Sequence, residues 1–85
     1  MYEVFFGRRA QKSFLKIPRQ QQLEIKKAIA KLTGNPFCFG TIKLINYPLA
    51  AYRHRVGDYR ILFDIEEKRK MVLVLDIKCR TSTTY

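Results

Sequence analysis

The stretch YRHRVGDYRILF, residues 52–63, decides the fold of this 85-residue chain because it predicts a β-hairpin. Gly57-Asp58 lies between two runs of strand-forming residues, and this arrangement indicates a two-residue turn. With that turn, Arg55 stands opposite Arg60. Because side chains alternate along a strand, Arg53, Arg55 and Arg60 share one face of the sheet.

The opposite face of the hairpin is apolar. It carries Tyr59, Ile61 and Phe63, and we expect the helices of the protein to cover it. The same alternation puts His54 on this face. A single histidine in such a place is expected to be a core residue rather than a catalytic one.

The arginines need an explanation beyond folding, since two arginines directly opposite each other repel. A bound phosphate supplies one, because a guanidinium group matches phosphate oxygens with two parallel hydrogen bonds. We expect Arg55 and Arg60 to converge on one phosphate and Arg53 to hold a neighbouring phosphate. A solvated outer face would also collect charges, so the pattern alone leaves that alternative open.

Hydrophobic periodicity predicts the remaining elements. Ala10, Phe14 and Ile17 recur with the spacing of an amphipathic helix, and Pro18 separates this helix from a second one. Residues 71–75 are continuously apolar, which is typical of a central strand. The expected elements are a strand at 2–6, helices at 8–17 and 18–33, an extended piece at 41–45, and strands at 51–56, 59–65 and 71–77.

This order of elements predicts an α+β fold. An N-terminal strand and a helical hairpin precede a C-terminal antiparallel sheet, and the helices pack on one face of that sheet. A chain of 85 residues can build one core of two layers, so residues 1–85 are expected to form a single domain.

The charge of the chain points to a polyanionic partner, either a nucleic acid or an acidic protein. Lys and Arg number 17 against 7 Asp and Glu, which gives a net charge of +10. Residues 7–33 hold eight basic residues and one acidic residue, a net charge of +7.

The composition argues against several other classes of protein. No apolar run is long enough for a membrane span, and the N-terminus lacks the pattern of a signal peptide, so a cytoplasmic location is expected. Cys38 and Cys79 form no CxxC pair and His54 is the only histidine, so no metal site is expected. No glycine-rich nucleotide-binding loop occurs, and we expect no cofactor.

The hairpin at 52–63, the proline between the two helices and the arginine that precedes a final tyrosine resemble the RelE branch of the RelE/ParE toxin superfamily. The resemblance covers nearly the whole chain. It implies a RelE-like toxin of a type II toxin–antitoxin system, an endoribonuclease that cleaves messenger RNA in the ribosomal A site. The implied partners are the ribosome with its messenger RNA and a cognate antitoxin. The charge on residues 7–33 suits an acidic C-terminal segment of that antitoxin.

The resemblance also implies roles for individual residues. The family's catalytic positions fall on Arg60, Arg80 and Tyr85, and its RNA-binding strand residues fall on Arg53 and Arg55. The implied reaction is attack of a ribose 2′-hydroxyl on the adjacent phosphate, leaving a cyclic phosphate and a 5′-hydroxyl. Arg60 and Arg80 suit the stabilisation of charge on the transition state.

The general base of this reaction stays open. Cys79 stands where many relatives carry a histidine, and arginine does not give up its proton in proteins. Strand alternation puts Arg80 on the face of Val74 and Asp76.

Two alternative functions also stay open: a ParE-like inhibitor of DNA gyrase without nuclease activity, and a non-catalytic nucleic-acid-binding module.

Overall fold

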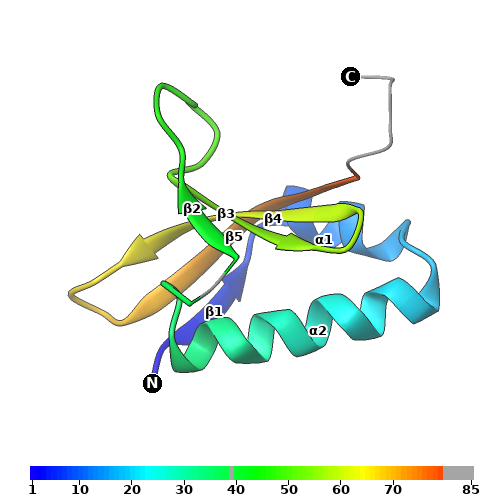
Figure 1. Cartoon of the computed structure of the whole chain (residues 1–85), viewed down its shortest axis with the longest axis horizontal. Helices are drawn as coiled ribbons and strands as arrows, with labels where there is room; N and C mark the ends of the chain where they lie inside the picture. Colours follow the sequence, from blue (N-terminus) through cyan, green and yellow to red (C-terminus); the bar gives the residue numbers. More distant parts are fainter. Residues whose placement is uncertain (39, 80–85) are drawn as a thin grey trace.

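Two helices and a five-stranded sheet form the described part, residues 1–38 and 40–79, of the computed structural model (Figure 1). Every element expected from the sequence is present, in the expected order. The elements are β1 (Glu3–Phe6), α1 (Arg8–Leu15), α2 (Arg19–Gly34), β2 (Thr41–Lys43), β3 (Tyr52–Val56), β4 (Tyr59–Glu66) and β5 (Met71–Cys79).

The sheet is mixed, with the strand order β1-β5-β4-β3-β2. The strands β2 to β5 pair antiparallel, as predicted for the C-terminal part of the chain. The N-terminal strand β1 adds a parallel edge beside β5, with Glu3 opposite Met71 and Phe6 opposite Val74. The apolar strand β5 therefore has a neighbour on each side, which confirms its predicted central place.

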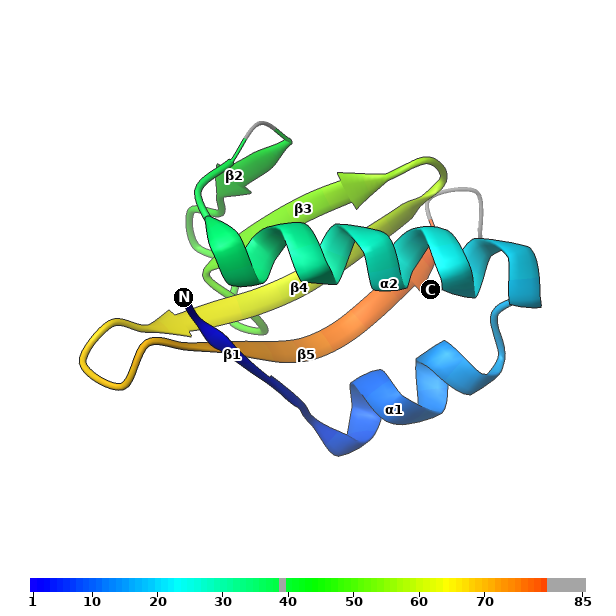
Figure 2. The same cartoon turned by 90° about the horizontal axis from the view of Figure 1, so that it is seen from below.

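Both helices lie on one side of the sheet, and α2 crosses over the strands in Figure 2. The predicted inward face of the hairpin is confirmed, because Ile61 and Phe63 have no exposed surface. Burying side chains of this size stabilises the fold by about 1.5–3 kcal/mol each. The buried core consists of Ala10, Ile17, Ile25, Leu32, Ile61, Phe63, Val72, Val74 and Ile77.

The break between the helices follows from Pro18. Helix α1 ends at Leu15, two residues earlier than the periodicity predicted, and Pro18 is the N-cap of α2. Proline suits the start of a helix because its missing N–H has no partner there in any case. Ile17 lies between the helices and remains in the core.

In the part of the chain that the structure describes, neither helix is long and apolar enough to cross a membrane.

A bulge in β5 changes which side chains face which way. Leu62 pairs with Asp76 while the next residue, Phe63, pairs with Val74, so Leu75 is an extra residue in β5. Because Phe63 and Arg60 of β4 point to opposite faces, their partners Val74 and Lys78 also lie on opposite faces, although they are four residues apart. The regular alternation expected along this strand therefore does not continue past the bulge.

Candidate nucleic-acid interface

The hairpin between β3 and β4 has the predicted register. Val56 pairs with Tyr59, and Arg55 pairs with Arg60. At the turn, Gly57 has a φ of 56° and Asp58 is not among the residues with positive φ. Glycine with positive φ at the first turn position is the pattern of a type II′ turn, whose twist matches that of the flanking strands. The turn thus fixes the register of the two strands, in which Arg55 stands opposite Arg60.

Four basic side chains lie on the outer face of the sheet, which we call the cationic face: Arg53, Arg55, Arg60 and Lys78. Arg60 on β4 pairs with Arg55 on one side and with Lys78 on the other. This row of like charges runs across three neighbouring strands. Among residues 1–38 and 40–79, no acidic side chain forms an ion pair with any of its arginines.

Three of these side chains surround one cavity of about 250 Å³, which we call the basic cavity. Arg53, Arg60 and Lys78 line it and are half-buried. Its remaining lining residues are Leu44, Tyr47 and Leu62. Partial burial lowers the effective dielectric around the cations, so an anion here is bound more strongly than on an open surface.

Arg55 lies outside the basic cavity, contrary to the expectation that it converges with Arg60. It is exposed and lines a different cavity, of about 370 Å³, together with Lys27 and Lys31 of α2. Long side chains reach diagonal as well as direct neighbours across a pair of strands. Arg53 is such a diagonal neighbour of Arg60, and both line the basic cavity.

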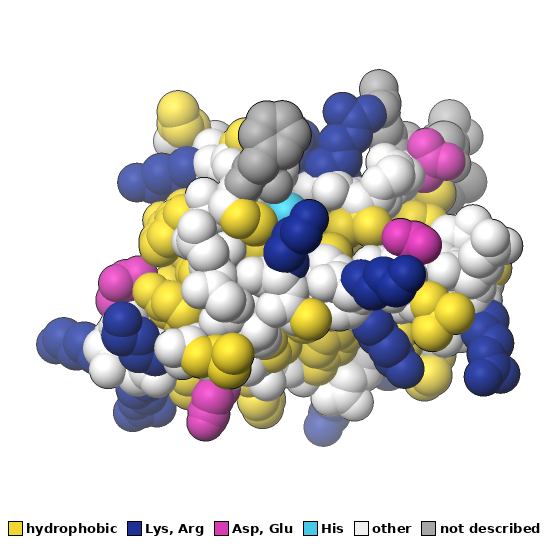
Figure 3. Space-filling view, turned by 60° about the horizontal axis from the view of Figure 1, so that its bottom comes forward, with side chains coloured by type: hydrophobic (Ala, Val, Ile, Leu, Met, Phe, Trp, Pro, Cys, Tyr) yellow, Lys and Arg dark blue, Asp and Glu magenta, His cyan; other side chains and the backbone are white. Residues whose placement is uncertain are grey.

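Further basic side chains are spread over the face that carries the helices, and fewer acidic ones lie among them (Figure 3). Lys26, Lys27 and Lys31 are exposed on α2. Lys26 lies 5.9 Å from the centre of the Phe14 ring, a cation–π contact that leaves the ammonium group at the surface. The two sides of the sheet thus both present positive charge.

His54 is a core residue, as predicted. It is 5% exposed, and its Nδ1 lies 2.8 Å from the hydroxyl oxygen of Thr41. Burial lowers the pKa of His54, and the charge of Lys31 lowers it further. In register it stands opposite Ile61, so it belongs to the face away from the basic cavity.

Other predicted site residues lie elsewhere. Cys79 pairs with Tyr59 and lines a separate cavity beside the hairpin turn. Burial raises the pKa of Tyr59, and the charges of Cys79 and Asp58 add to this rise. Arg80 and Tyr85, two of the three predicted catalytic residues, lie outside the described residues.

Four lining residues of the basic cavity were missed from the sequence, and two of them, Tyr47 and Lys78, carry polar groups. Lys78 reaches it because of the bulge in β5, and residues 71–75 show no alternation from which a bulge could be read. Tyr47 belongs to the connection between β2 and β3, which reads only as a loop. An aromatic residue close in sequence to a basic strand was the available signal, since such pairs are common in nucleic-acid-binding proteins.

The fold is shared with solved structures of bacterial and archaeal toxins. The RelBE2 toxin–antitoxin complex of Mycobacterium tuberculosis is 24% identical, with a TM-score of 0.82 over 93% of this chain and 98% of that one. The archaeal RelE–RelB complex of Pyrococcus horikoshii is 26% identical, with a TM-score of 0.80 over 96% and 98%. The isolated Escherichia coli RelE toxin is 20% identical, with a TM-score of 0.80 over 99% and 89%.

These likenesses show that the chain has a RelE-like toxin fold. Residues 4–83 match the family model for the ParE toxin of type II toxin–antitoxin systems, parDE. The chain belongs to this family of type II toxins. A comparison with curated protein sequences gives no match.

Proposed function

We propose that this toxin is a ribosome-dependent endoribonuclease that cleaves messenger RNA in the ribosomal A site. The observation that carries the proposal is the basic cavity. Arg53, Arg60 and Lys78 come from three different strands and are half-buried around one space. Folding alone gains nothing from bringing like charges together, whereas a phosphate group of RNA would neutralise them.

In the proposed reaction, a ribose 2′-hydroxyl attacks the adjacent phosphate and the 5′-oxygen leaves. Arg60 lies at the centre of the cationic face and stabilises the charge that develops on the phosphate oxygens. Arg53 and Arg55 bind the RNA backbone. Lys78 carries an ammonium group that can donate a proton to the leaving oxygen. By resemblance to the RelE branch, Arg80 and Tyr85 are further catalytic residues.

The proposed ribosome requirement follows from the lack of a suitable general base at the basic cavity among residues 1–38 and 40–79. His54 is buried on the other side of the sheet and is hydrogen-bonded to Thr41, so it is unsuited to the task. Arginine cannot serve, because it stays protonated. Correct alignment of the 2′-hydroxyl with the phosphate can supply a large part of the rate by itself. The ribosome would impose this alignment on the A-site codon.

A cognate antitoxin is the second proposed partner. The solved structures from M. tuberculosis and P. horikoshii are toxin–antitoxin complexes of similar folds. The eight basic residues and one acidic residue of positions 7–33 would be neutralised by an acidic segment of such a partner.

A second candidate function is inhibition of DNA gyrase without nuclease chemistry. The match to the ParE family model favours it. An inhibitor that acts by binding gyrase has no need of a cavity shaped for phosphate, so the basic cavity favours the nuclease.

The experiment that separates these functions is induced expression without the antitoxin. We expect growth arrest with messenger RNA cut only where it is translated, and little cutting of free RNA by the isolated protein. Arg60→Ala should strongly reduce the cuts. Arg69→Ala, which changes an exposed arginine between β4 and β5, should leave them unchanged. Growth arrest with intact messages and inhibited supercoiling by gyrase would favour the second function.

A further inference from the structure

We infer that Tyr47 forms one wall of a nucleobase subsite next to the basic cavity, and that an RNA base stacks on its ring. The inference rests on the proposed function, because it takes the occupant of the basic cavity to be an RNA phosphate. It adds the residue and the cavity that receive the attached base.

Tyr47 belongs to a loop that is held at both ends. The backbone N–H of Leu44 donates to the carbonyl of Ala51 at 2.8 Å. The N–H of Ala51 in turn donates to the carboxylate of Asp64 on β4 at 2.6 Å. Within the loop, Asn46 adopts a φ of 55°, a left-handed conformation that asparagine tolerates better than most residues. In Figure 1 this loop rises on the side of the sheet away from α2.

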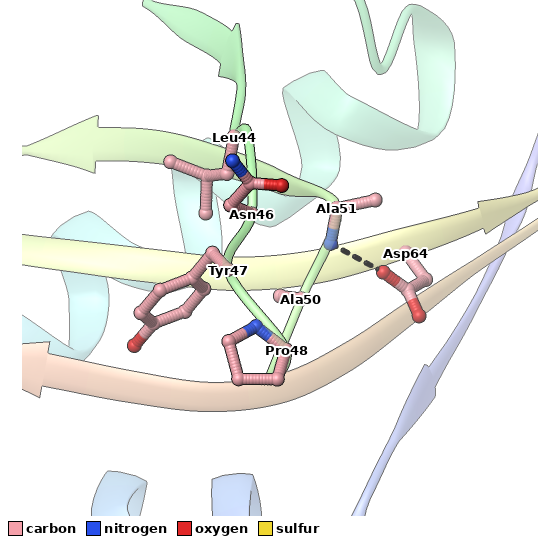
Figure 4. A pocket seen from close by; sticks show the side chains of 7 residues that line it. All are labelled: Leu44, Asn46, Tyr47, Pro48, Ala50, Ala51 and Asp64. Carbon is pink, nitrogen blue, oxygen red and sulfur yellow. Dashed lines mark hydrogen bonds between the residues drawn. The ribbon is translucent and has the colours of Figure 1, made fainter.

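Leu44 and Tyr47 stand between two cavities and line both of them. On one side is the basic cavity. On the other is an open cavity of about 680 Å³, lined by Leu44, Asn46, Tyr47, Pro48, Ala50, Ala51 and Asp64. Figure 4 shows the tyrosine ring extended from the loop above the strands, with the Ala51–Asp64 hydrogen bond at the far side of the cavity.

This combination fits a single-stranded nucleotide. Proteins bind such nucleotides by pairing cations with the phosphates and by stacking the bases on aromatic rings. Tyr47 is 39% exposed, so part of its ring surface is open to a ligand. Asn46 and Asp64 add polar groups to the larger cavity that suit the edge of a base. Since both ends of the loop are anchored, less of the loop has to be ordered when RNA binds.

The test uses RNA that cannot be cut. A trinucleotide with 2′-O-methyl riboses is titrated into the protein and its affinity is measured by NMR, alongside versions that lack the base at each position in turn. For the wild type we expect one position at which loss of the base weakens binding roughly 5- to 150-fold, the range measured for base–aromatic stacking. Tyr47→Leu should weaken binding of the complete RNA to a similar degree and lose the dependence on that base.

Two further variants make the comparison specific. Tyr47→Phe keeps the ring and should retain the base dependence. Ile45→Ala changes a neighbouring loop residue that is 84% exposed and lines neither cavity, so it should behave as the wild type. Affinity for the antitoxin is measured on the same proteins, and a loss in Tyr47→Leu confined to the antitoxin would make the loop a protein-binding surface and overturn the inference.

The outcomes separate this inference from the proposed function. Equal binding of complete and base-free RNA by the wild type, or no binding at millimolar RNA, would contradict the subsite. Base-dependent binding through Tyr47 without any cleavage on ribosomes would leave the subsite standing and refute the nuclease.

Discussion

Arg60 lies between Arg55 and Lys78 in the register of the sheet, and it lines the basic cavity. A donor that meets charge developing in the transition state typically contributes a factor of about 100–1,000 in rate. We therefore expect Arg60→Ala to slow single-turnover cleavage on saturated ribosomes by about this factor. The measurement is made at saturating ribosome concentration so that binding does not enter it.

Arg55→Ala is the matched control from the same hairpin. Arg55 is exposed and lies outside the basic cavity, so its loss should weaken ribosome binding and lower the salt dependence of binding by about one charge. The cleavage rate at saturation should stay near that of the wild type. If Arg60→Ala also cuts at the wild-type rate once saturated, Arg60 is a binding residue and the assigned roles are wrong.

His54 makes the stability of the protein depend on pH. Its pKa in the folded state is lowered from the usual 6.5 by burial and by Lys31. Below about pH 6.5 the unfolded chain therefore binds a proton that the folded protein excludes. The free energy of unfolding should fall as the pH falls through this range, by at most about 1.4 kcal/mol per pH unit.

Urea unfolding at pH 7.5, 6.5 and 5.5 measures this slope. His54→Gln has no titrating group at the site and should lose the part of the slope that lies above pH 5.5. A slope that is the same in both proteins would show that other groups cause it.

At the scale of elements, the bulge in β5 is tied to α1. Beyond Val74, β5 has no paired residue in β1, and α1 follows β1 directly after Gly7. The hydroxyl of Ser13 on α1 donates to the carboxylate of Asp76 at 2.6 Å, and the N–H of Ile77 donates to the same oxygen at 2.8 Å. Asp76 is 6% exposed, so water cannot easily replace these contacts.

We expect Asp76→Ala to lower the free energy of unfolding by about 3 kcal/mol, because hydrogen bonds to a charged group contribute about 1.5–3 kcal/mol each. Ser13→Ala removes one of the two contacts and should cost about half as much. The loss of stability in the double variant should be smaller than the sum of the losses in the two single variants, since the two residues interact. Urea unfolding gives all three values.

Asp76→Asn is the matched control for this cycle. It keeps an acceptor oxygen and nearly the same volume, so its loss of stability should be much smaller than that of Asp76→Ala. Full additivity of the Ser13 and Asp76 substitutions would show that the hydrogen bond between them does not link α1 to β5.

The molecule as a whole carries positive charge on both sides of its sheet. Arg53, Arg60 and Lys78 surround the basic cavity on one side, and the exposed lysines of α2 lie on the other, where Lys27 and Lys31 share a cavity with Arg55. Two polyanions could therefore be bound by different surfaces: RNA by the cationic face and an acidic antitoxin segment by the helices. This division is a prediction that follows from the proposed function.

The affinity of the antitoxin should fall by at least about tenfold between low salt and 0.5 M salt, because ions screen the contacts at the rim of the interface. Lys27→Gln on α2 should reduce this salt dependence, whereas Lys68→Gln between β4 and β5 should not. A tight complex with the same affinity at both salt concentrations would contradict the electrostatic part of the proposal.

Local sequence patterns were enough to predict the elements and the inward face of the hairpin. Gly57-Asp58 set the register of the hairpin, because a two-residue turn leaves one way to pair the strands that follow it. From this register came the shared face of Arg53, Arg55 and Arg60 and the burial of His54. Each of these features depends on residues close together in the chain, which periodicity and turn chemistry describe well.

Which cations share a cavity depends on contacts between residues that are far apart in the chain. Lys78 joins Arg60 because of a bulge stabilised by a contact between Ser13 and Asp76, which are 63 positions apart. Tyr47 reaches the basic cavity because Asp64 of β4 anchors its loop. The parallel pairing of β1 with β5 likewise joins the two ends of the described chain. Such contacts leave no periodic trace in the sequence, because they depend on how completed elements pack.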